Sequence, residues 1–116
     1  MKKYVITKEQ VKPLVNDNRG ALTTLAITVD GEPIGIMWKQ KTHLPYDSGW
    51  RFCAGSESED FTEKLVNNSE VYCLNVIANI DPAIIPYLNA PDGTYLVRIV
   101  GTNQFIAVEK GTPIEC

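Results

Sequence analysis

Short runs of apolar and β-branched residues alternate with polar clusters along most of the chain. Runs of this kind, bounded by Gly, Pro, Asn, Asp and Ser, are typical of strands in an antiparallel sheet. No run repeats at a fixed period, and no linker-like stretch divides the chain. The pattern predicts strands at residues 4–6, 21–29, 33–40, 50–54, 71–76, 94–100 and 104–108.

Two stretches favour a helix instead. Residues 8–15 carry apolar side chains at helical spacing, and Thr7 with Gln10 gives a capping-box pattern at their start. Asp81 followed by Pro82 is a second helix start, because Asp accepts a backbone N–H and Pro fits the first helical position. Both helices are expected to be short, since each contains an internal proline.

Turn signals join these elements. Asp30-Gly31 stands between two predicted strands and predicts a tight hairpin, because such turns need a residue with positive φ. The Pro-Asp-Gly at residues 91–93 predicts a further turn before the last two strands. Strands therefore dominate. We expect a single α+β domain over residues 1–116, with a mostly antiparallel sheet and a few short helices.

Composition narrows the range of possible functions. With 44% hydrophobic and 22% charged residues among 116, the chain can bury a core without a disulfide or a metal. A net charge of −3 argues against direct nucleic-acid binding, which favours a basic surface. No apolar run is long enough to span a membrane, and the first ten residues lack the apolar segment of a secretory signal. Three cysteines without a CxxC spacing fit a reduced, cytoplasmic protein.

The stretch DSGWRF packs turn chemistry and three large side chains into six positions. Asp47 and the Ser-Gly after it favour a turn. In the strand that follows, Trp50 and Phe52 share one face while Arg51 points to the other. One interpretation buries both aromatics and pairs Arg51 with Asp47 or another acid. The alternative makes Trp50 and Arg51 a recognition surface, since Trp and Arg are enriched at binding hot spots.

The segment GSESEDFTE, residues 55–63, carries Glu57, Glu59 and Asp60 without a basic residue. It lacks the residue order and the central Gly of a calcium-binding loop. The acids can favour the first turn of a helix through its dipole, or they can form a patch that docks on a basic partner.

The residues give no support for catalysis. His43 is the only histidine, no nucleophile motif accompanies it, and the ligands of a metal site are lacking. We therefore expect no catalytic, cofactor-binding or metal-binding residues. Asn75, Asn79 and Asp81 are polar groups in an apolar stretch, suited to capping and to bonding exposed backbone. Together with Arg51 they could instead line a polar pocket.

Several motifs stand in a recognisable order: GEPIGIMWKQ, then DSGWRFCAGSESED, then VYCLNVIANIDPAIIPYLNAPDGT. In this order and spacing they resemble the immunity protein 33 family of small bacterial proteins. The resemblance spans roughly residues 31–98. Its motifs lie at residues 34–38, 47–52, 55–59, 75–82 and 91–93.

The resemblance implies a cytoplasmic bacterial protein that neutralises a secreted toxin by binding it, with no catalytic residues to transfer. It places a family-like core at about residues 31–108. Residues 1–30 are then an N-terminal strand-helix-strand extension.

Three hypotheses follow. The first is a non-enzymatic protein that binds a protein partner. Its candidate contact residues are Tyr46, Asp47, Trp50, Arg51, Glu57, Glu59 and Asp60, with Tyr87 as a further contact. The second is a small ligand-binding or enzymatic domain with the polar pocket just described. The third is a homodimer that associates through an exposed strand edge or an apolar patch.

Overall fold

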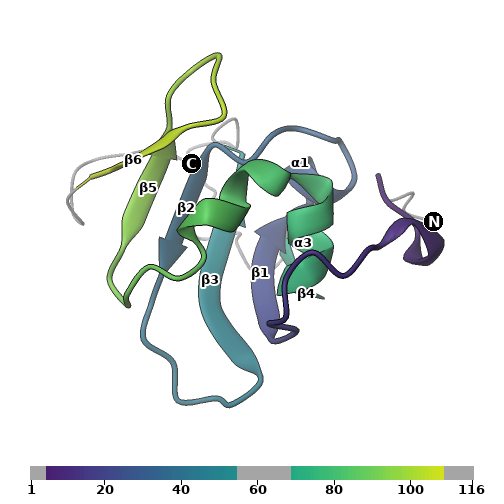
Figure 1. Ribbon diagram of the computed structural model, residues 1–116, viewed down its shortest axis with the longest axis horizontal. Coiled ribbons are helices and arrows are strands. Elements are labelled where there is room, and N and C mark those ends of the chain that lie inside the picture. The colour runs from purple at the N-terminus through teal and green to yellow at the C-terminus, as the bar shows by residue number, and fades with distance from the viewer. Residues whose placement is uncertain (1–4, 55–68, 109–116) are drawn as a thin grey trace.

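The computed structural model describes residues 5–54 and 69–108. Six strands form one sheet in the order β4-β1-β3-β2-β5-β6 (Figure 1). All neighbouring strands pair antiparallel except β1 and β3, which run parallel. The predicted α+β class with a mostly antiparallel sheet is confirmed. The strands are β1 (Gly20–Thr24), β2 (Ile36–Lys39), β3 (Asp47–Cys53), β4 (Ser69–Cys73), β5 (Tyr95–Arg98) and β6 (Phe105–Ala107).

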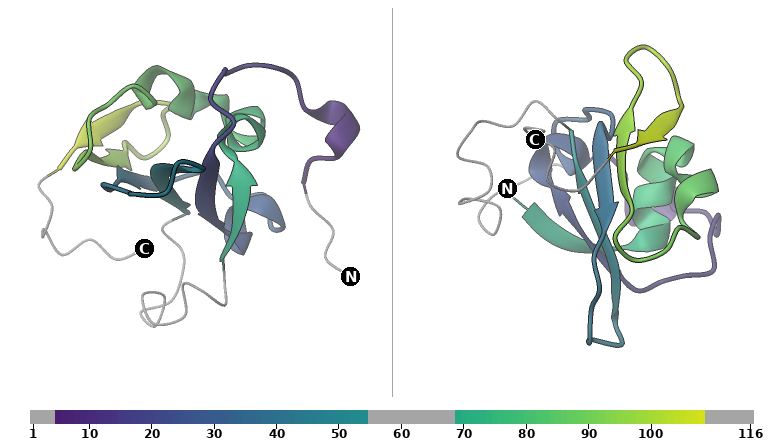
Figure 2. Two further views of the ribbon diagram at one scale, coloured as in Figure 1. Left: turned by 90° about the horizontal axis from the view of Figure 1, so that it is seen from below. Right: turned by 90° about the vertical axis from the view of Figure 1, so that its left-hand side faces the viewer.

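Helices cover one face of this sheet. Both α3 (Leu74–Ile80) and the 3₁₀ helix η2 (Pro82–Tyr87) lie there, which we call the helix-covered face (Figure 2). The main core fills the space between: Trp50 and Phe52 from β3 meet Ile77 and Ile84 from the helices. As predicted, Asp81 caps η2 by accepting the Ala83 N–H at 3.3 Å.

The other face, which we call the opposite face, carries the alternate side chains of the same strands. Ile36 and Cys53 are buried on it, and partly buried hydrophobic side chains from β2 and β5 pack against them. Because side chains alternate along a strand, each strand contributes to both faces. The sheet therefore separates two layers of different composition.

The predicted strand at residues 21–29 is only half correct. The chain leaves the sheet after Thr24 and forms one helical turn, α1 (Leu25–Thr28), which buries Ile27 in the core. A short apolar run does not distinguish a strand from a buried helical turn by periodicity.

The predicted hairpin at Asp30-Gly31 is wrong, because β1 pairs with β3 and β4, and β2 pairs with β3 and β5. Gly31 does adopt a positive φ of 76°.

Other expected elements are shorter than predicted. The strand expected at 71–76 ends at Cys73, and α3 begins at once. In the helix expected at 8–15, only η1 (Lys8–Gln10) forms, with the Thr7 N–H donating to Gln10 Oε1 at 2.8 Å as a capping box requires. Residues 5 and 6 form a bend and not a strand.

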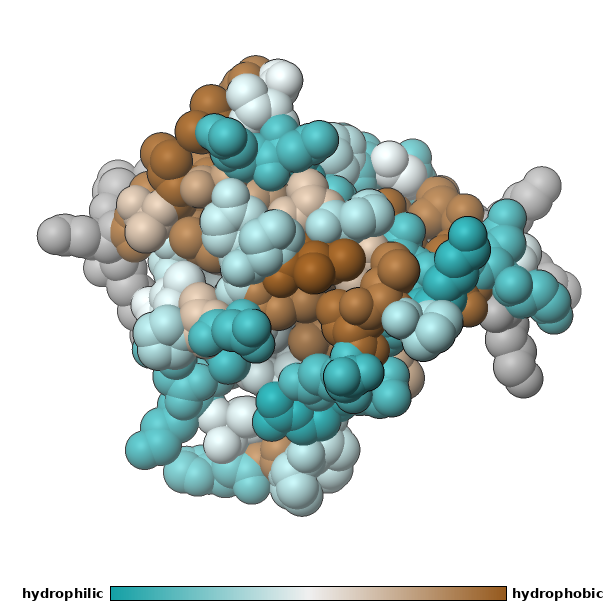
Figure 3. Space-filling view, in the orientation of Figure 1, coloured by the Kyte–Doolittle hydropathy of each residue, from teal (hydrophilic) through white to brown (hydrophobic). Residues whose placement is uncertain are grey.

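We call residues 5–15 the N-terminal arm. Apolar surface gathers on the helix-covered face around α3 and this arm (Figure 3).

Candidate functional site

Trp50 lies in the core. Its side chain is 1% exposed, its ring stacks on Phe52 with 6.0 Å between centroids, and its indole N–H donates to the Leu88 carbonyl at 3.3 Å. A side chain in this position supports the sheet and does not reach a partner. For Trp50, the structure therefore favours the core interpretation over the recognition surface.

Arg51 points to the opposite face and pairs with Asp47. Two guanidinium N–H groups donate to the two carboxylate oxygens, at 3.0 and 2.9 Å, so the pair is bidentate. Asp47 also accepts the Gly49 N–H at 2.9 Å and the Thr42 hydroxyl at 3.1 Å. The hydrogen bond from Arg51 is the main reason that the pKa of Asp47 falls from 3.8 to about 2. The ionised Asp47 carboxylate therefore links Arg51, Gly49 and Thr42 at the start of β3.

The hydrogen bonds of Asp47 help to fix the loop of residues 40–46. Leu44 donates its N–H to the Thr42 hydroxyl at 3.2 Å, and the Leu44 carbonyl accepts the Asp47 N–H at 3.1 Å. The Tyr46 carbonyl accepts the Gly20 N–H at 2.6 Å, which joins the loop to β1. The loop thus presents two exposed apolar side chains, with Leu44 48% and Tyr46 68% exposed. A loop held in this way loses little entropy when a partner binds.

A row of side chains crosses the opposite face at the level of Arg51. The register pairs Leu22 with Arg51, Arg51 with Trp38, and Trp38 with Tyr95, so the four lie side by side on four strands. The rings of Trp38 and Tyr95 stack with 5.7 Å between centroids and are partly exposed. We call Leu22, Arg51, Trp38 and Tyr95 the aromatic row.

Beside the stacked rings lies a hollow of about 120 Å³, lined also by residues of the β2 end and of the turn before β5. Small-molecule pockets are typically about 300–1,000 Å³, so this hollow suits one protein side chain and not a ligand. Sequence reasoning missed Trp38, because its place beside Arg51 depends on strand register. The alternation of Met37 and Trp38 in IMWK was the available signal.

The acidic candidates Glu57, Glu59 and Asp60 lie outside the described residues. Their predicted contribution to partner binding stays a prediction. Tyr87, a further candidate, is partly buried: its ring packs edge-on against Phe105, and its hydroxyl accepts the Phe105 N–H at 3.0 Å.

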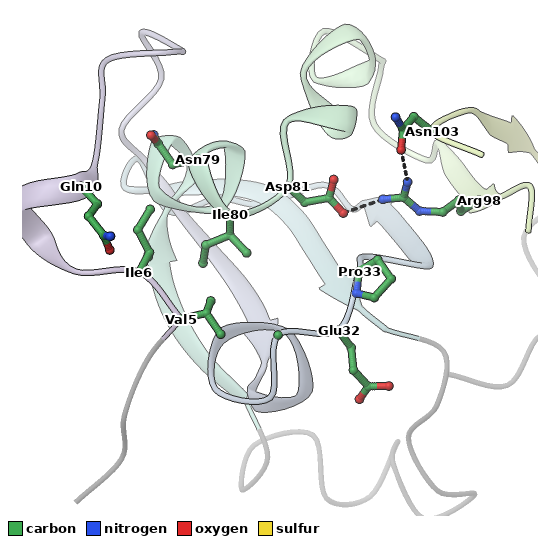
Figure 4. A pocket seen from close by; sticks show the side chains of 11 residues that line it. Val5, Ile6, Gln10, Glu32, Pro33, Asn79, Ile80, Asp81, Arg98 and Asn103 are labelled. Carbon is green, nitrogen blue, oxygen red and sulfur yellow. Dashed lines mark hydrogen bonds and ion pairs between the residues drawn. The ribbon is translucent and has the colours of Figure 1, made fainter. Parts of the chain in front are cut away.

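A cavity of about 520 Å³ lies between the N-terminal arm, the segment before β2, the end of α3 and β5 (Figure 4). Asp81 and Arg98 face each other in it, with Arg98 Nη2 donating to Asp81 Oδ2 at 2.5 Å. Asp81 also accepts the Ile34 N–H at 3.0 Å, and Arg98 donates to the Ile34 carbonyl at 2.7 Å and to Asn103 Oδ1 at 3.3 Å. These two charged side chains are thus bonded to each other and to the backbone.

The predicted polar pocket does not form around its four residues. Arg51 lies on the opposite face, while Asn75 and Asn79 bond the backbone of the N-terminal arm. Of the four, Asn79 and Asp81 line the cavity, and Arg98 pairs with the Asp81 carboxylate. Within residues 5–54 and 69–108, no group of three or more His, Cys, Asp or Glu side chains could hold a metal ion. Over the same ranges, no helix has the length and apolar character to cross a membrane.

A family model, described as Immunity protein Imm33 domain, matches residues 21–109. The matched span is most of the chain and takes in all six strands except the first residue of β1. The chain belongs to the Imm33 family. No curated protein and no solved structure matches it. The Imm33 match begins ten residues before the core expected at 31–108, and it includes β1, which lies between β3 and β4.

Proposed function

We propose that this Imm33 chain is a non-enzymatic immunity protein, which neutralises a bacterial protein toxin in the cytoplasm by binding it directly. The observation that carries the proposal is the Imm33 match over residues 21–109. The cavity adds support, because Asp81 and Arg98, which line it, pair with each other and with the Ile34 backbone.

The surface we assign to the toxin is the aromatic row together with the loop of residues 40–46. Trp, Tyr and Arg are the residue types enriched at binding hot spots, and Trp38, Tyr95 and Tyr46 are at least partly exposed. The hollow beside Trp38 and Tyr95 suits an inserted side chain of the partner. Arg51 and Asp47 hold the surface in shape, and the acidic candidates Glu57, Glu59 and Asp60 would attract a basic partner.

The test is co-expression with candidate toxin genes taken from the neighbourhood of the gene of this protein. We expect growth to be restored, and the purified proteins to form a stable complex by calorimetry. Light scattering during size exclusion then gives the stoichiometry and shows whether the free chain is a monomer or a homodimer. Restored growth without any complex would indicate an enzymatic mode of protection and would contradict the proposal.

A further inference from the structure

Two asparagines on α3 hold the N-terminal arm. Asn75 Oδ1 accepts the N–H groups of Leu14 at 2.9 Å and Val15 at 3.0 Å, and Asn75 Nδ2 donates to the Lys12 carbonyl at 2.9 Å. One turn further on, Asn79 Oδ1 accepts the Lys12 N–H at 2.8 Å and Asn79 Nδ2 donates to the Lys12 carbonyl at 2.8 Å. Residues four apart share one side of a helix, so the two amides act together on one stretch of chain.

These five hydrogen bonds involve only the main chain of the arm. The amides therefore bind the main chain of this stretch, which turns at Pro13 where the Leu14 N–H also donates to the Lys12 carbonyl at 2.9 Å, and they do not read its side chains. Asn75 is buried beneath the arm, so its amide needs such partners: a buried polar group without a hydrogen bond is costly. The asparagine pair is thus a site for peptide main chain, whichever chain supplies it.

The arm fills this site poorly. Leu14 remains 43% exposed, and Lys12 and Pro13 are exposed as well. A mostly apolar hollow of about 430 Å³ lies open between the arm and the elements beneath it. It is lined by Ile6, Thr7, Val11, Thr28, Tyr72, Val76 and Ile80. A segment whose apolar side chains entered this hollow would gain contacts that the arm does not make.

The occupant also lies outside the family domain. Asn75 and Asn79 fall within the Imm33 match, whereas residues 5–15 precede it. The family domain therefore supplies the site, and a segment outside the family match occupies it.

We propose that the Asn75–Asn79 side of α3 is a binding site for the main chain of a peptide segment with apolar side chains. The N-terminal arm is its intramolecular occupant, and such a segment of a partner protein displaces it. This site lies on the helix-covered side and is independent of the aromatic row.

The probe is a fluorescent synthetic peptide of residues 7–16, TKEQVKPLVN. In the full chain, the double substitution Lys12→Pro and Leu14→Pro removes two of the N–H groups that the asparagines accept and releases the arm, while α3 is unchanged. We expect this released chain to bind the peptide at least about tenfold more tightly than the wild type, in which the arm competes at high effective concentration.

Two controls separate peptide recognition from other effects. Adding Asn79→Ala to the released chain removes two hydrogen bonds and should weaken peptide binding about tenfold. A peptide carrying K12P and L14P should not bind. A released chain that unfolds cooperatively yet binds no peptide, or binds both peptides equally, overturns the proposal.

Hydrogen exchange on the wild-type chain gives an answer even if the released chain does not fold. We expect the amides of Lys12, Leu14 and Val15 to exchange about 100-fold faster than those of Ile77 and Ala78, because the arm opens without unfolding the core. Protection of the arm equal to that of α3 would show a fixed structural strap and would overturn the proposal.

Discussion

Trp50 on β3 and Trp38 on β2 belong to neighbouring strands, but their side chains leave the sheet on different faces. Trp50 is enclosed between the sheet and the helices, while Trp38 stacks on Tyr95 at the opposite face and keeps part of its surface exposed. The helix-covered face thus holds the fold together. The opposite face combines Trp, Tyr and Arg without burying them fully, which is the composition of a binding surface.

Two of the ion pairs show the same difference between the faces. On the helix-covered side, Arg98 and Asp81 join β5, the segment before β2 and the cap of η2. On the opposite face, Arg51 and Asp47 fix a single loop that carries exposed apolar side chains. One pair connects distant segments, and the other shapes a surface. Substitutions should therefore cost folding energy on one face and binding energy on the other.

The largest difference is expected between the tryptophans. Trp50→Ala should lower the free energy of unfolding by about 3–5 kcal/mol, because it empties a buried site. Trp38→Ala should cost about 1 kcal/mol, mainly the loss of the stack with Tyr95. Urea denaturation followed by circular dichroism measures both. Equal costs would show that the two faces contribute alike to stability.

Asp81→Ala should be the next most damaging change, at about 3 kcal/mol, since it leaves Arg98 and the Ile34 N–H without their acceptor in a site where both charged side chains are mostly buried. The matched control is Asp17→Ala, which removes the more exposed pair with Arg19 and should cost no more than about 0.5 kcal/mol. Thermal and urea unfolding of both variants gives the comparison. A control as costly as Asp81→Ala would remove the contrast between the pairs.

Gly49→Ala tests how tightly the loop at the opposite face is held. Gly49 has φ of +86°, and an added Cβ would lie 2.5 Å from the Gln40 carbonyl oxygen. Strain and clash together should cost about 2–3 kcal/mol. Gly93→Ala is the control, because Gly93 has φ of +91° but nothing lies within 4 Å of the added Cβ. It should cost only about 1 kcal/mol by denaturation, and a similar loss at both sites would count against the close approach at Gly49.

The Asp47–Arg51 pair should give the smallest effect, visible as a pH dependence. The pKa of Asp47 is lowered to about 2 in the folded chain, so the stabilisation is complete above about pH 4 and is lost as the pH falls towards 2. Between these values, the wild type should lose on the order of 1–2 kcal/mol more than Asp47→Asn, which keeps an acceptor for the Gly49 N–H. Urea titrations at stepped pH measure the difference. If stability fell with pH equally in the two proteins, the ionised Asp47 carboxylate would not stabilise the fold.

Local chemistry in the sequence predicted several features of both faces. Alternation in the strand after residue 49 placed Trp50 and Phe52 together and Arg51 opposite them, and spacing allowed the pairing of Arg51 with Asp47. The Asp81-Pro82 start of η2 also followed from capping preferences alone. Each of these depends on residues close in the chain.

The features that the sequence did not predict depend on contacts between residues far apart in the chain. The parallel pairing of β1 with β3 and the row from Leu22 to Tyr95 depend on register between distant strands, which no local pattern specifies. The turn Leu25–Thr28 becomes helical because burying Ile27 outweighs the β propensity of the run. Asn75 and Asn79 were expected to bond exposed backbone, but nothing nearby in the chain identified the N-terminal arm as their partner.

The central claim is that the toxin binds the opposite face, and calorimetric titration of one variant tests it most directly. Trp38→Ala should weaken the complex with a toxin found by the co-expression test by about tenfold or more, as expected for a hot-spot aromatic. Val100→Ala, which shortens a side chain 96% exposed at the turn between β5 and β6, should leave the affinity unchanged. Wild-type affinity in a folded Trp38→Ala chain would contradict the claim.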